Sequence, residues 1–261
     1  MARIQANGVD INYELTGAER APVVVLSHSL GCSLAMWDGQ MAALTDRWRV
    51  LRYDTRGHGQ SGVPAEPYSI GQLADDVVAL LDALELETVH FCGLSLGGTI
   101  GQTLALQHRK RLASLILCAT ASHLPPPHLW QERAAMAREQ GMVAVGDAVM
   151  ERWFTEGFRE QEPARAAAIR QLVVDTAPDG YANCCLAIRN FDVRDAVREI
   201  ELPTLVIVGA DDPATPPSMA QVMAERISGA RLEVIEDAAH LVNIQQEAAF
   251  NDALVTFLGA Q

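Results

Sequence analysis

The chain has 261 residues, 49% hydrophobic and 20% charged, which is typical of one large globular domain or of a domain with an insertion. Its formal net charge is −13, and an acidic surface argues against nucleic acid or an anionic membrane as a partner, since both attract a positive face. The chain has no 18-residue apolar run and no apolar core of signal-peptide length at its start, so we expect a cytoplasmic protein.

The cysteines are five in number, an odd count, and they lack the spacing of metal ligands. Most of them lie in apolar segments, which predicts buried free thiols and neither disulfides nor a metal site. We expect no cofactor. The cysteines are Cys32, Cys92, Cys118, Cys184 and Cys185.

The first elements of the chain predict the edge of a sheet followed by buried strands. Residues 2–16 predict two strands joined at Asn7 and Gly8, a dipeptide that suits a tight hairpin turn. Residues 22–27 form a continuous apolar run, as in strands that are covered on both faces of a parallel sheet. A loop at 28–31, a helical pattern over 36–44 and a strand at 49–53 come next.

A polar, glycine-rich turn follows at residues 54–61. Its charged groups resemble catalytic ones, but such a turn must satisfy many of its own backbone groups, so we expect a scaffolding role. The helix predicted over 70–84 begins with a capping box formed by Ser69 and Gln72, and its leucines and Val77 share one face.

The motif Gly-Leu-Ser-Leu-Gly at residues 93–97 lies between an apolar strand and a helix-forming run over 99–107. A serine on so sharp a strand-to-helix turn has a strained backbone, and a Cβ two residues before or after it would clash. The pattern in this setting predicts a nucleophile elbow that presents Ser95 beyond the carboxyl end of the sheet.

A strand is predicted at 114–118, and then the alternation of strands and helices stops. Residues from about 125 to 195 are helical by pattern, with helices near 129–139, 143–154, 164–175 and 181–190. The alternation resumes with a strand at 204–208, a helix at 219–227, a strand at 231–235 and a closing helix at 246–258. We therefore expect an α/β core domain over 1–120 and 196–261, with a mostly parallel, doubly wound sheet, and an inserted helical cap over 121–195.

Three polar side chains follow strands of the predicted sheet. A serine nucleophile needs an imidazole to take its proton, and that imidazole needs an acid to set its tautomer. Ser95, Asp212 and His240 each follow a strand, in the chain order of α/β-hydrolases. Asp211 is the alternative acid and His28 the alternative base. We expect the backbone N–H groups of Leu30 and Leu96 to form the oxyanion hole.

Five motifs together resemble the α/β-hydrolase superfamily over nearly the whole chain. They lie at residues 28–31, 54–59, 93–98, 209–213 and 237–240. More narrowly, the sequence resembles the 3-oxoadipate enol-lactonases in its length and in residues 93–99, 212–217, 152–155 and 187–189. Ser29 departs from this pattern, because many relatives have glycine after the histidine.

The resemblance implies a small-molecule lactone or ester as substrate, and an enol-lactone ring that opens through an acyl-enzyme on Ser95. The substrate's carboxylate would need a positive or hydrogen-bonding partner, for which Arg133 and Arg138 are the candidates. Trp130 is the candidate aromatic contact, while Trp153 and its neighbours are expected in the core of the cap. The alternatives are a carboxylesterase, a carbon–carbon bond hydrolase, or a ligand-binding receptor without turnover.

Overall fold

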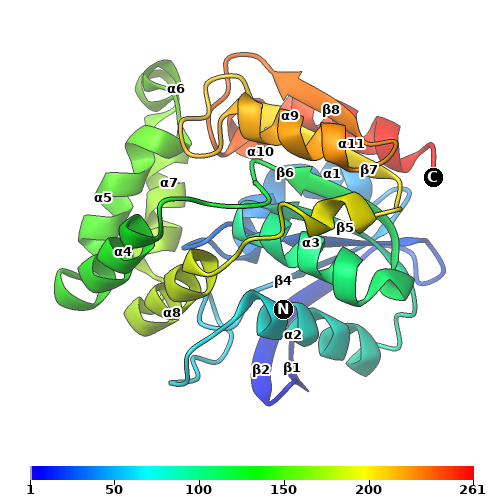
Figure 1. Ribbon diagram of the computed structural model, residues 1–261, viewed down its shortest axis with the longest axis horizontal. Coiled ribbons are helices and arrows are strands. Elements are labelled where there is room, and N and C mark those ends of the chain that lie inside the picture. The colour runs from blue at the N-terminus through cyan, green and yellow to red at the C-terminus, as the bar shows by residue number, and fades with distance from the viewer. Residues whose placement is uncertain (1) are drawn as a thin grey trace.

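An eight-stranded sheet forms the centre of the computed structural model, which describes residues 2–261 (Figure 1). The strand order is β1-β2-β4-β3-β5-β6-β7-β8. The strands are β1 Ala2–Ala6, β2 Val9–Thr16, β3 Val23–Ser27, β4 Arg49–Tyr53, β5 Val89–Leu94, β6 Leu112–Cys118, β7 Thr204–Gly209 and β8 Arg231–Ile235. The α-helices are α1 Asp38–Leu44, α2 Ile70–Ala83, α3 Leu96–Gln107, α4 Pro127–Glu139, α5 Gly141–Trp153, α6 Glu156–Gln161, α7 Pro163–Val174, α8 Pro178–Arg189, α9 Pro217–Arg226, α10 Val242–Gln245 and α11 Glu247–Leu258.

The sheet is antiparallel only at one edge. β1 pairs with β2, and β2 with β4, in antiparallel fashion, and all other pairs are parallel. The expected hairpin is confirmed: Ala6 pairs with Val9, and Asn7 and Gly8 between them have positive φ angles of 48° and 75°. The mostly parallel, doubly wound sheet predicted from the alternating pattern is likewise confirmed.

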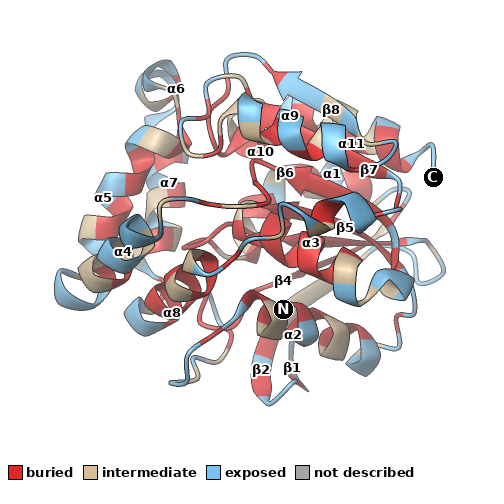
Figure 2. Ribbon diagram, in the orientation of Figure 1, coloured by how far each residue is buried: buried red, intermediate tan, exposed pale blue. Residues whose placement is uncertain are grey.

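The central strands are covered on both faces. Every residue of β3, β5 and β7 is buried, as expected for continuous apolar strands in a parallel sheet (Figure 2). The amphipathic helix α2 buries Leu73, Val77 and Leu80, and the Ser69 hydroxyl accepts a hydrogen bond of 3.1 Å from the Gln72 N–H at its start. This arrangement leaves the carboxyl ends of the parallel strands as the place where loops converge.

The inserted helices, α4–α8, lie together at one end of the molecule beside the sheet (left in Figure 1). α4 packs on α8, and α5 packs on α7. Within the described part of the chain, this segment has no strand beyond an isolated bridge between His123 and Asp192. The sequence pattern predicted this run of helices between the two groups of strands.

Two short helices were not predicted. α6 has 6 residues and α10 has 4, both too short to show a helical repeat of apolar residues. α6 is instead started by a local cap, in which the Thr155 hydroxyl accepts a hydrogen bond of 3.3 Å from the Phe158 N–H.

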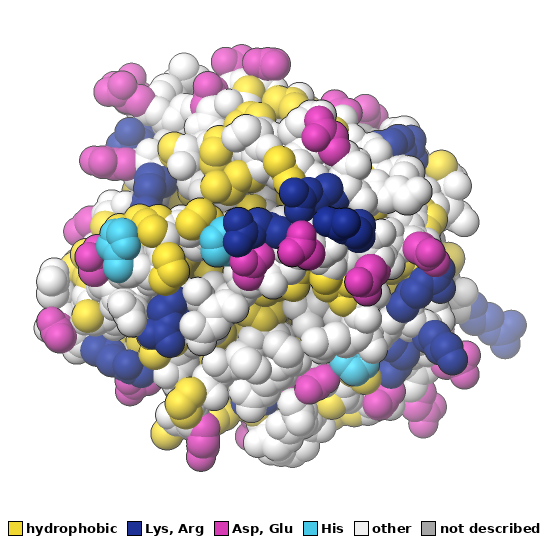
Figure 3. Space-filling view, in the orientation of Figure 1, with side chains coloured by type: hydrophobic (Ala, Val, Ile, Leu, Met, Phe, Trp, Pro, Cys, Tyr) yellow, Lys and Arg dark blue, Asp and Glu magenta, His cyan; other side chains and the backbone are white. Residues whose placement is uncertain are grey.

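Charged side chains of both signs are interspersed on the face shown in Figure 3. All five cysteines are buried and free, as predicted. Among residues 2–261 no helix is both long enough and apolar enough to span a membrane.

A glycine contact joins the inserted helices to the core. A Cβ on Gly180, in α8, would overlap the backbone of Gly57 in the turn after β4. We expect Gly180→Ala to destabilise the protein by about 1–3 kcal/mol, because the backbones must move apart. Gly157→Ala is the matched control, since its Cβ would meet nothing and alanine favours the helix. Urea unfolding of both variants measures the difference; equal stability would contradict the prediction.

Candidate active site

Ser95 lies at the tight turn between β5 and α3. Its φ and ψ angles are 55° and −107°, a strained conformation for a residue with a side chain. A Cβ on Gly93 would overlap the Gly97 carbonyl, and a Cβ on Gly97 would overlap the Ser27 carbonyl of β3. The glycines are therefore required by the close approach of three backbone segments, as the motif predicted.

Hydrogen bonds from β6 and the loop after it hold this turn in place. The Ser95 N–H donates to the Cys118 carbonyl at 2.9 Å, and the Thr120 hydroxyl donates to the Ser95 carbonyl at 2.9 Å. The Ser95 side chain is thus held at the carboxyl end of the sheet, where it lines a cavity of about 190 Å³.

His240 lines the same cavity and is bonded to a carboxylate behind it. It follows β8, and its Nδ1 donates to Asp212 Oδ2 at 2.8 Å. Asp212 follows β7, as predicted, whereas the side chain of the alternative acid, Asp211, is exposed. The structure therefore brings Asp212, and not Asp211, to the imidazole.

Asp212 is ionised despite being almost fully buried. Burial opposes the charge, but His240 and the hydrogen bonds outweigh it, and the pKa of Asp212 is lowered. The Ala214 and Thr215 N–H groups donate to Oδ1 at 2.8 and 3.0 Å, and the Thr215 hydroxyl donates to Oδ2 at 2.7 Å. A charged acid in this position stabilises the tautomer of His240 that has its proton on Nδ1 and leaves Nε2 free to accept one.

Trp153 packs against the imidazole from the inserted helices. The rings of Trp153 and His240 are stacked, with centroids 6.5 Å apart and an interplanar angle of 29°. The Leu241 N–H also donates to the Trp153 carbonyl at 3.1 Å. The end of α5 is therefore in direct contact with the segment that presents His240, whereas the sequence had suggested only a core position for Trp153.

The two residues predicted to supply oxyanion donors, Leu30 and Leu96, differ in their relation to the cavity, because only Leu30 lines it. Leu96 is the first residue of α3, where N–H groups have no partner within the helix. Leu30 lines the cavity, and no described residue accepts a hydrogen bond from its N–H. Both side chains are buried, so only the backbone groups are available for this chemistry.

Two buried histidines hold the loop that contains Leu30. His28 Nε2 accepts from the Thr55 N–H at 2.9 Å, and its Nδ1 donates to the Ser29 carbonyl at 2.8 Å. His58 Nε2 accepts from the Gly31 N–H at 2.9 Å. Both nitrogens of His28 are engaged, so it is poorly placed to act as the alternative base.

Burial keeps both of these histidines neutral. It lowers the pKa of His28 to about 4 and, with a further contribution from His28, that of His58 to about 3. In each ring the nitrogen that accepts from a backbone N–H must be unprotonated. The conformation of this loop therefore depends on both imidazoles being neutral.

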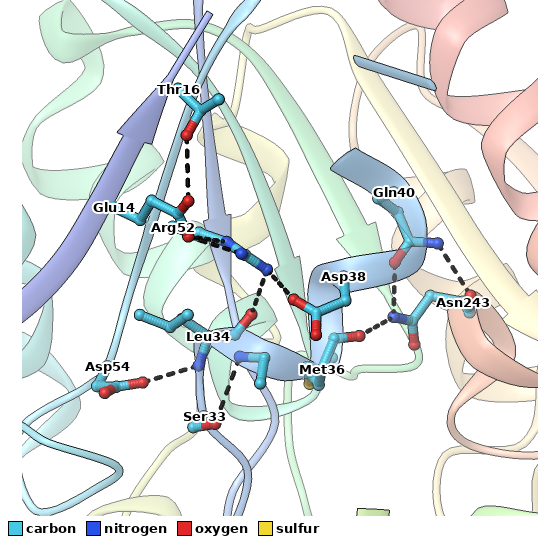
Figure 4. A network of polar contacts seen from close by, with 11 residues as sticks. Glu14, Thr16, Ser33, Leu34, Met36, Asp38, Gln40, Arg52, Asp54 and Asn243 are labelled. Carbon is cyan, nitrogen blue, oxygen red and sulfur yellow. Dashed lines mark hydrogen bonds and ion pairs between the residues drawn. The ribbon is translucent and has the colours of Figure 1, made fainter. Parts of the chain in front are cut away.

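A polar network supports the segment that follows the same loop (Figure 4). The Leu34 N–H donates to Asp54 at 2.7 Å, and Arg52 forms ion pairs with Glu14 and Asp38. Asn243 donates to the Met36 carbonyl at 3.1 Å. These contacts join the loop that contains Leu30 to β2, β4 and the helix after His240.

The turn at 54–61 has the scaffolding contacts expected of it. Asp54 accepts hydrogen bonds from Asn12, Leu34 and Gln60, and its carboxylate is buried. Arg56 forms a buried ion pair with Asp76 of α2. These charged groups are satisfied within the scaffold and do not line the cavity.

The candidate substrate residues have different positions. Trp130 and Arg133 line the cavity, and the Arg133 guanidinium lies 4.7 Å from the centre of the Trp130 ring. Arg138 does not line it, because its guanidinium is bonded to Asp179 at 3.0 Å and to Asn183 at 2.9 Å.

Other cavity residues were not singled out in the sequence. The complete lining is Ser29, Leu30, Ser95, Leu124, Pro125, Leu129, Trp130, Arg133, Val149, Arg152, Trp153, Tyr181, Pro213, Ala214, Thr215, Met219 and His240. Two of these residues, Arg152 of α5 and Tyr181 of α8, have polar side chains and were not predicted to line the cavity. Across the described residues, no cluster of three His, Cys, Asp or Glu side chains could hold a metal ion.

Comparison with known proteins identifies close relatives. The model of the alpha/beta hydrolase fold matches residues 22–141 and 137–247. A 3-oxoadipate enol-lactonase of Acinetobacter baylyi is 41% identical over 96% of this chain and 94% of its own, and a second from that organism is 37% identical over 93% and 91%. The crystal structure of the enol-lactonase from Burkholderia xenovorans LB400 is 44% identical, with a TM-score of 0.97, over 99% of this chain and 100% of that one.

The buried histidines predict a loss of stability in mild acid. Because their folded-state pKa values are depressed, the unfolded chain takes up protons first, and stability is fully present only above about pH 6.5. As the pH falls toward 4, each of the two histidines should lower the free energy of unfolding by about 1.4 kcal/mol per pH unit. The measurement is urea unfolding between about pH 7 and pH 5.

His58→Gln tests the origin of this slope. Glutamine does not titrate, but its side-chain oxygen can accept from the Gly31 N–H. We expect the slope to fall by about 1.4 kcal/mol per pH unit relative to the unmodified protein. An unchanged slope in this variant would show that His58 is not buried in its neutral form.

Proposed function

The chain belongs to the alpha/beta hydrolase family, and from that premise we propose that it opens a carboxylate-bearing enol-lactone, converting 3-oxoadipate enol-lactone to 3-oxoadipate. The single observation that carries the proposal is the bond from His240 to the buried Asp212, in a cavity that Ser95 also lines. The enol-lactonase relatives support the choice of substrate.

In the proposed mechanism Ser95 attacks the lactone carbonyl while His240 Nε2 takes the hydroxyl proton. Asp212 stabilises the resulting imidazolium and stays ionised itself. The ring C–O bond then breaks, the enol oxygen leaves with the proton from His240, and the enol converts to the ketone. Water activated by the same imidazole attacks the acyl-enzyme, which releases the acid and restores the Ser95 hydroxyl.

The negative charge that develops on the carbonyl oxygen needs donors that are already in place. We assign this role to the Leu30 N–H in the cavity lining and to the Leu96 N–H at the start of α3. A single such donor is worth about 3 kcal/mol of transition-state stabilisation. The Leu30 loop needs no rearrangement to supply it, since His28 and His58 already hold the backbone on both sides.

We also propose that the inserted helices act as a cap, with the core over 1–120 and 196–261 and the cap over 121–195. Cavity residues from α4, α5 and α8 face those from the core loops, which is the arrangement that a cap requires. Within it we assign substrate contact to Trp130 and Arg133. Arg138 is set aside because its guanidinium is already paired outside the cavity.

The decisive experiment is a turnover assay of the purified protein. We expect kcat/KM for 3-oxoadipate enol-lactone to exceed that for simple aryl acetates by orders of magnitude. Faster hydrolysis of the aryl esters would favour the carboxylesterase alternative, and cleavage of a carbon–carbon bond in a diketone acid would favour the other hydrolase. Tight stoichiometric binding without hydrolysis of any of these would indicate a receptor.

Neighbouring aspartates allow a matched test of the proposed acid. Asp212→Asn should lower kcat about 10⁴-fold, because the amide favours the wrong tautomer of His240. Asp211→Asn removes the same charge one residue away, at an exposed side chain, and should stay near the unmodified rate. Ser95→Ala and His240→Ala should abolish turnover while the fold, followed by circular dichroism, persists. If Asp211→Asn lowers kcat by a comparable factor and Asp212→Asn does not, the acid is Asp211 and our assignment of Asp212 is wrong.

A further inference from the structure

Two arginines line the catalytic cavity without a carboxylate partner. Arg133, on α4, and Arg152, near the end of α5, form no ion pair and no hydrogen bond with any described residue. Three other arginines of the inserted helices are paired: Arg138 with Asp179, Arg165 with Glu247 and Arg170 with Asp147. Arg159 and Arg189 form no ion pair with a described residue either, but they do not line the cavity. Arg133 and Arg152 are therefore the arginines of the described inserted helices that both lack a carboxylate partner and line the catalytic cavity, in a chain of net charge −13.

The position of Arg152 is electrostatically unfavourable as it stands. Burial lowers the pKa of Arg152, and the nearby positive charge of Arg133 lowers it further, while Tyr181 acts weakly in the other direction. The Trp130 ring partly offsets the unfavourable charge of Arg133, but no aromatic ring lies against the guanidinium of Arg152 among the described residues. A half-buried pair of like charges is stabilised by an anion placed between or beside them.

The guanidinium groups also have space around them. A second cavity, of about 250 Å³, shares Leu129, Arg133, Val149, Arg152 and Tyr181 with the first. The only carboxylate that lines it, Glu132, forms no ion pair with either arginine. The pair therefore lies where the two cavities adjoin, and a ligand in the catalytic cavity can reach both.

We propose that Arg152, together with Arg133, binds the carboxylate of the substrate, so that Arg152 determines the preference for a free acid over its ester. The inference rests on the proposed function, because it concerns the same cavity. Arg152 is a specificity-determining residue here, because its side chain lines the same cavity as Ser95 and His240. A carboxylate bound by Arg152 therefore lies in the cavity that contains the proposed base.

The first test compares substrates with and without the free carboxylate. Arg152→Met keeps most of the side-chain length but removes the charge, and we expect kcat/KM for the enol-lactone to fall about 10- to 100-fold, mainly through KM. For the methyl ester of the same lactone, kcat/KM should fall far less in this variant, so the preference for the free acid over the ester should be lost. Arg152→Lys should restore part of that preference.

Arg170→Met is the matched control, because Arg170 pairs with Asp147 and does not line the cavity. It should leave the selectivity for the free acid unchanged. If the Arg152→Met variant folds, by circular dichroism and thermal unfolding, and keeps the full preference for the free acid, the proposal is wrong.

A binding measurement separates this inference from the proposed catalysis. In the Ser95→Ala background, adipate should bind with a Kd about 10- to 100-fold lower than in the same background with Arg152→Met, and dimethyl adipate should show no such difference. If adipate binding depends on Arg152 but the unmodified protein hydrolyses no lactone, the proposed function is wrong and the anion site stands. If the unmodified protein hydrolyses the lactone but adipate binding does not depend on Arg152, the anion site is wrong and the proposed function stands.

Discussion

The crowding of backbone around Ser95 is the constraint on which the rest of the site depends. β3, β5 and the start of α3 approach so closely that Gly93 and Gly97 have no room for side chains. The strain at Ser95, with its positive φ angle, is maintained because the buried sheet on either side cannot relax. Rigid neighbours thus hold the hydroxyl away from the sheet and place the first N–H groups of α3 directly behind it.

Hydrogen bonds between buried polar groups also position the loops around this turn. Neutral His28 and His58 hold the loop that contains Leu30 by accepting hydrogen bonds from backbone N–H groups, and Asn243, in the helix that follows His240, donates to the segment after that loop. Each is buried and bonded, so none is free to move independently of the others. Leu30, a proposed oxyanion donor, and His240, the proposed base, are therefore positioned by connected contacts, although they lie about two hundred residues apart in sequence.

Local pattern was enough to predict most of the fold, because alternation, capping and glycine spacing act over a few residues. It also placed Ser95, Asp212 and His240 after their strands, since parallel strands bring such loops to one edge. It could not predict which cap side chains reach the cavity. Arg138 and Arg152 both lie near helix ends, and only the packing of the inserted helices determines that Arg138 of α4 meets Asp179 of α8 while Arg152 of α5 lines the cavity.

The last turn of α5 has one consequence for how this enzyme could change during evolution. Arg152 and Trp153 are adjacent, so the charge proposed to bind the ligand and the ring that stacks on the imidazole share a single stretch of backbone. An insertion, a kink or a shifted helix end there would alter ligand choice and proton transfer together. New substrate preferences should therefore arise more readily by exchange of side chains on α4 or α8, which leave the imidazole undisturbed, than by remodelling this turn.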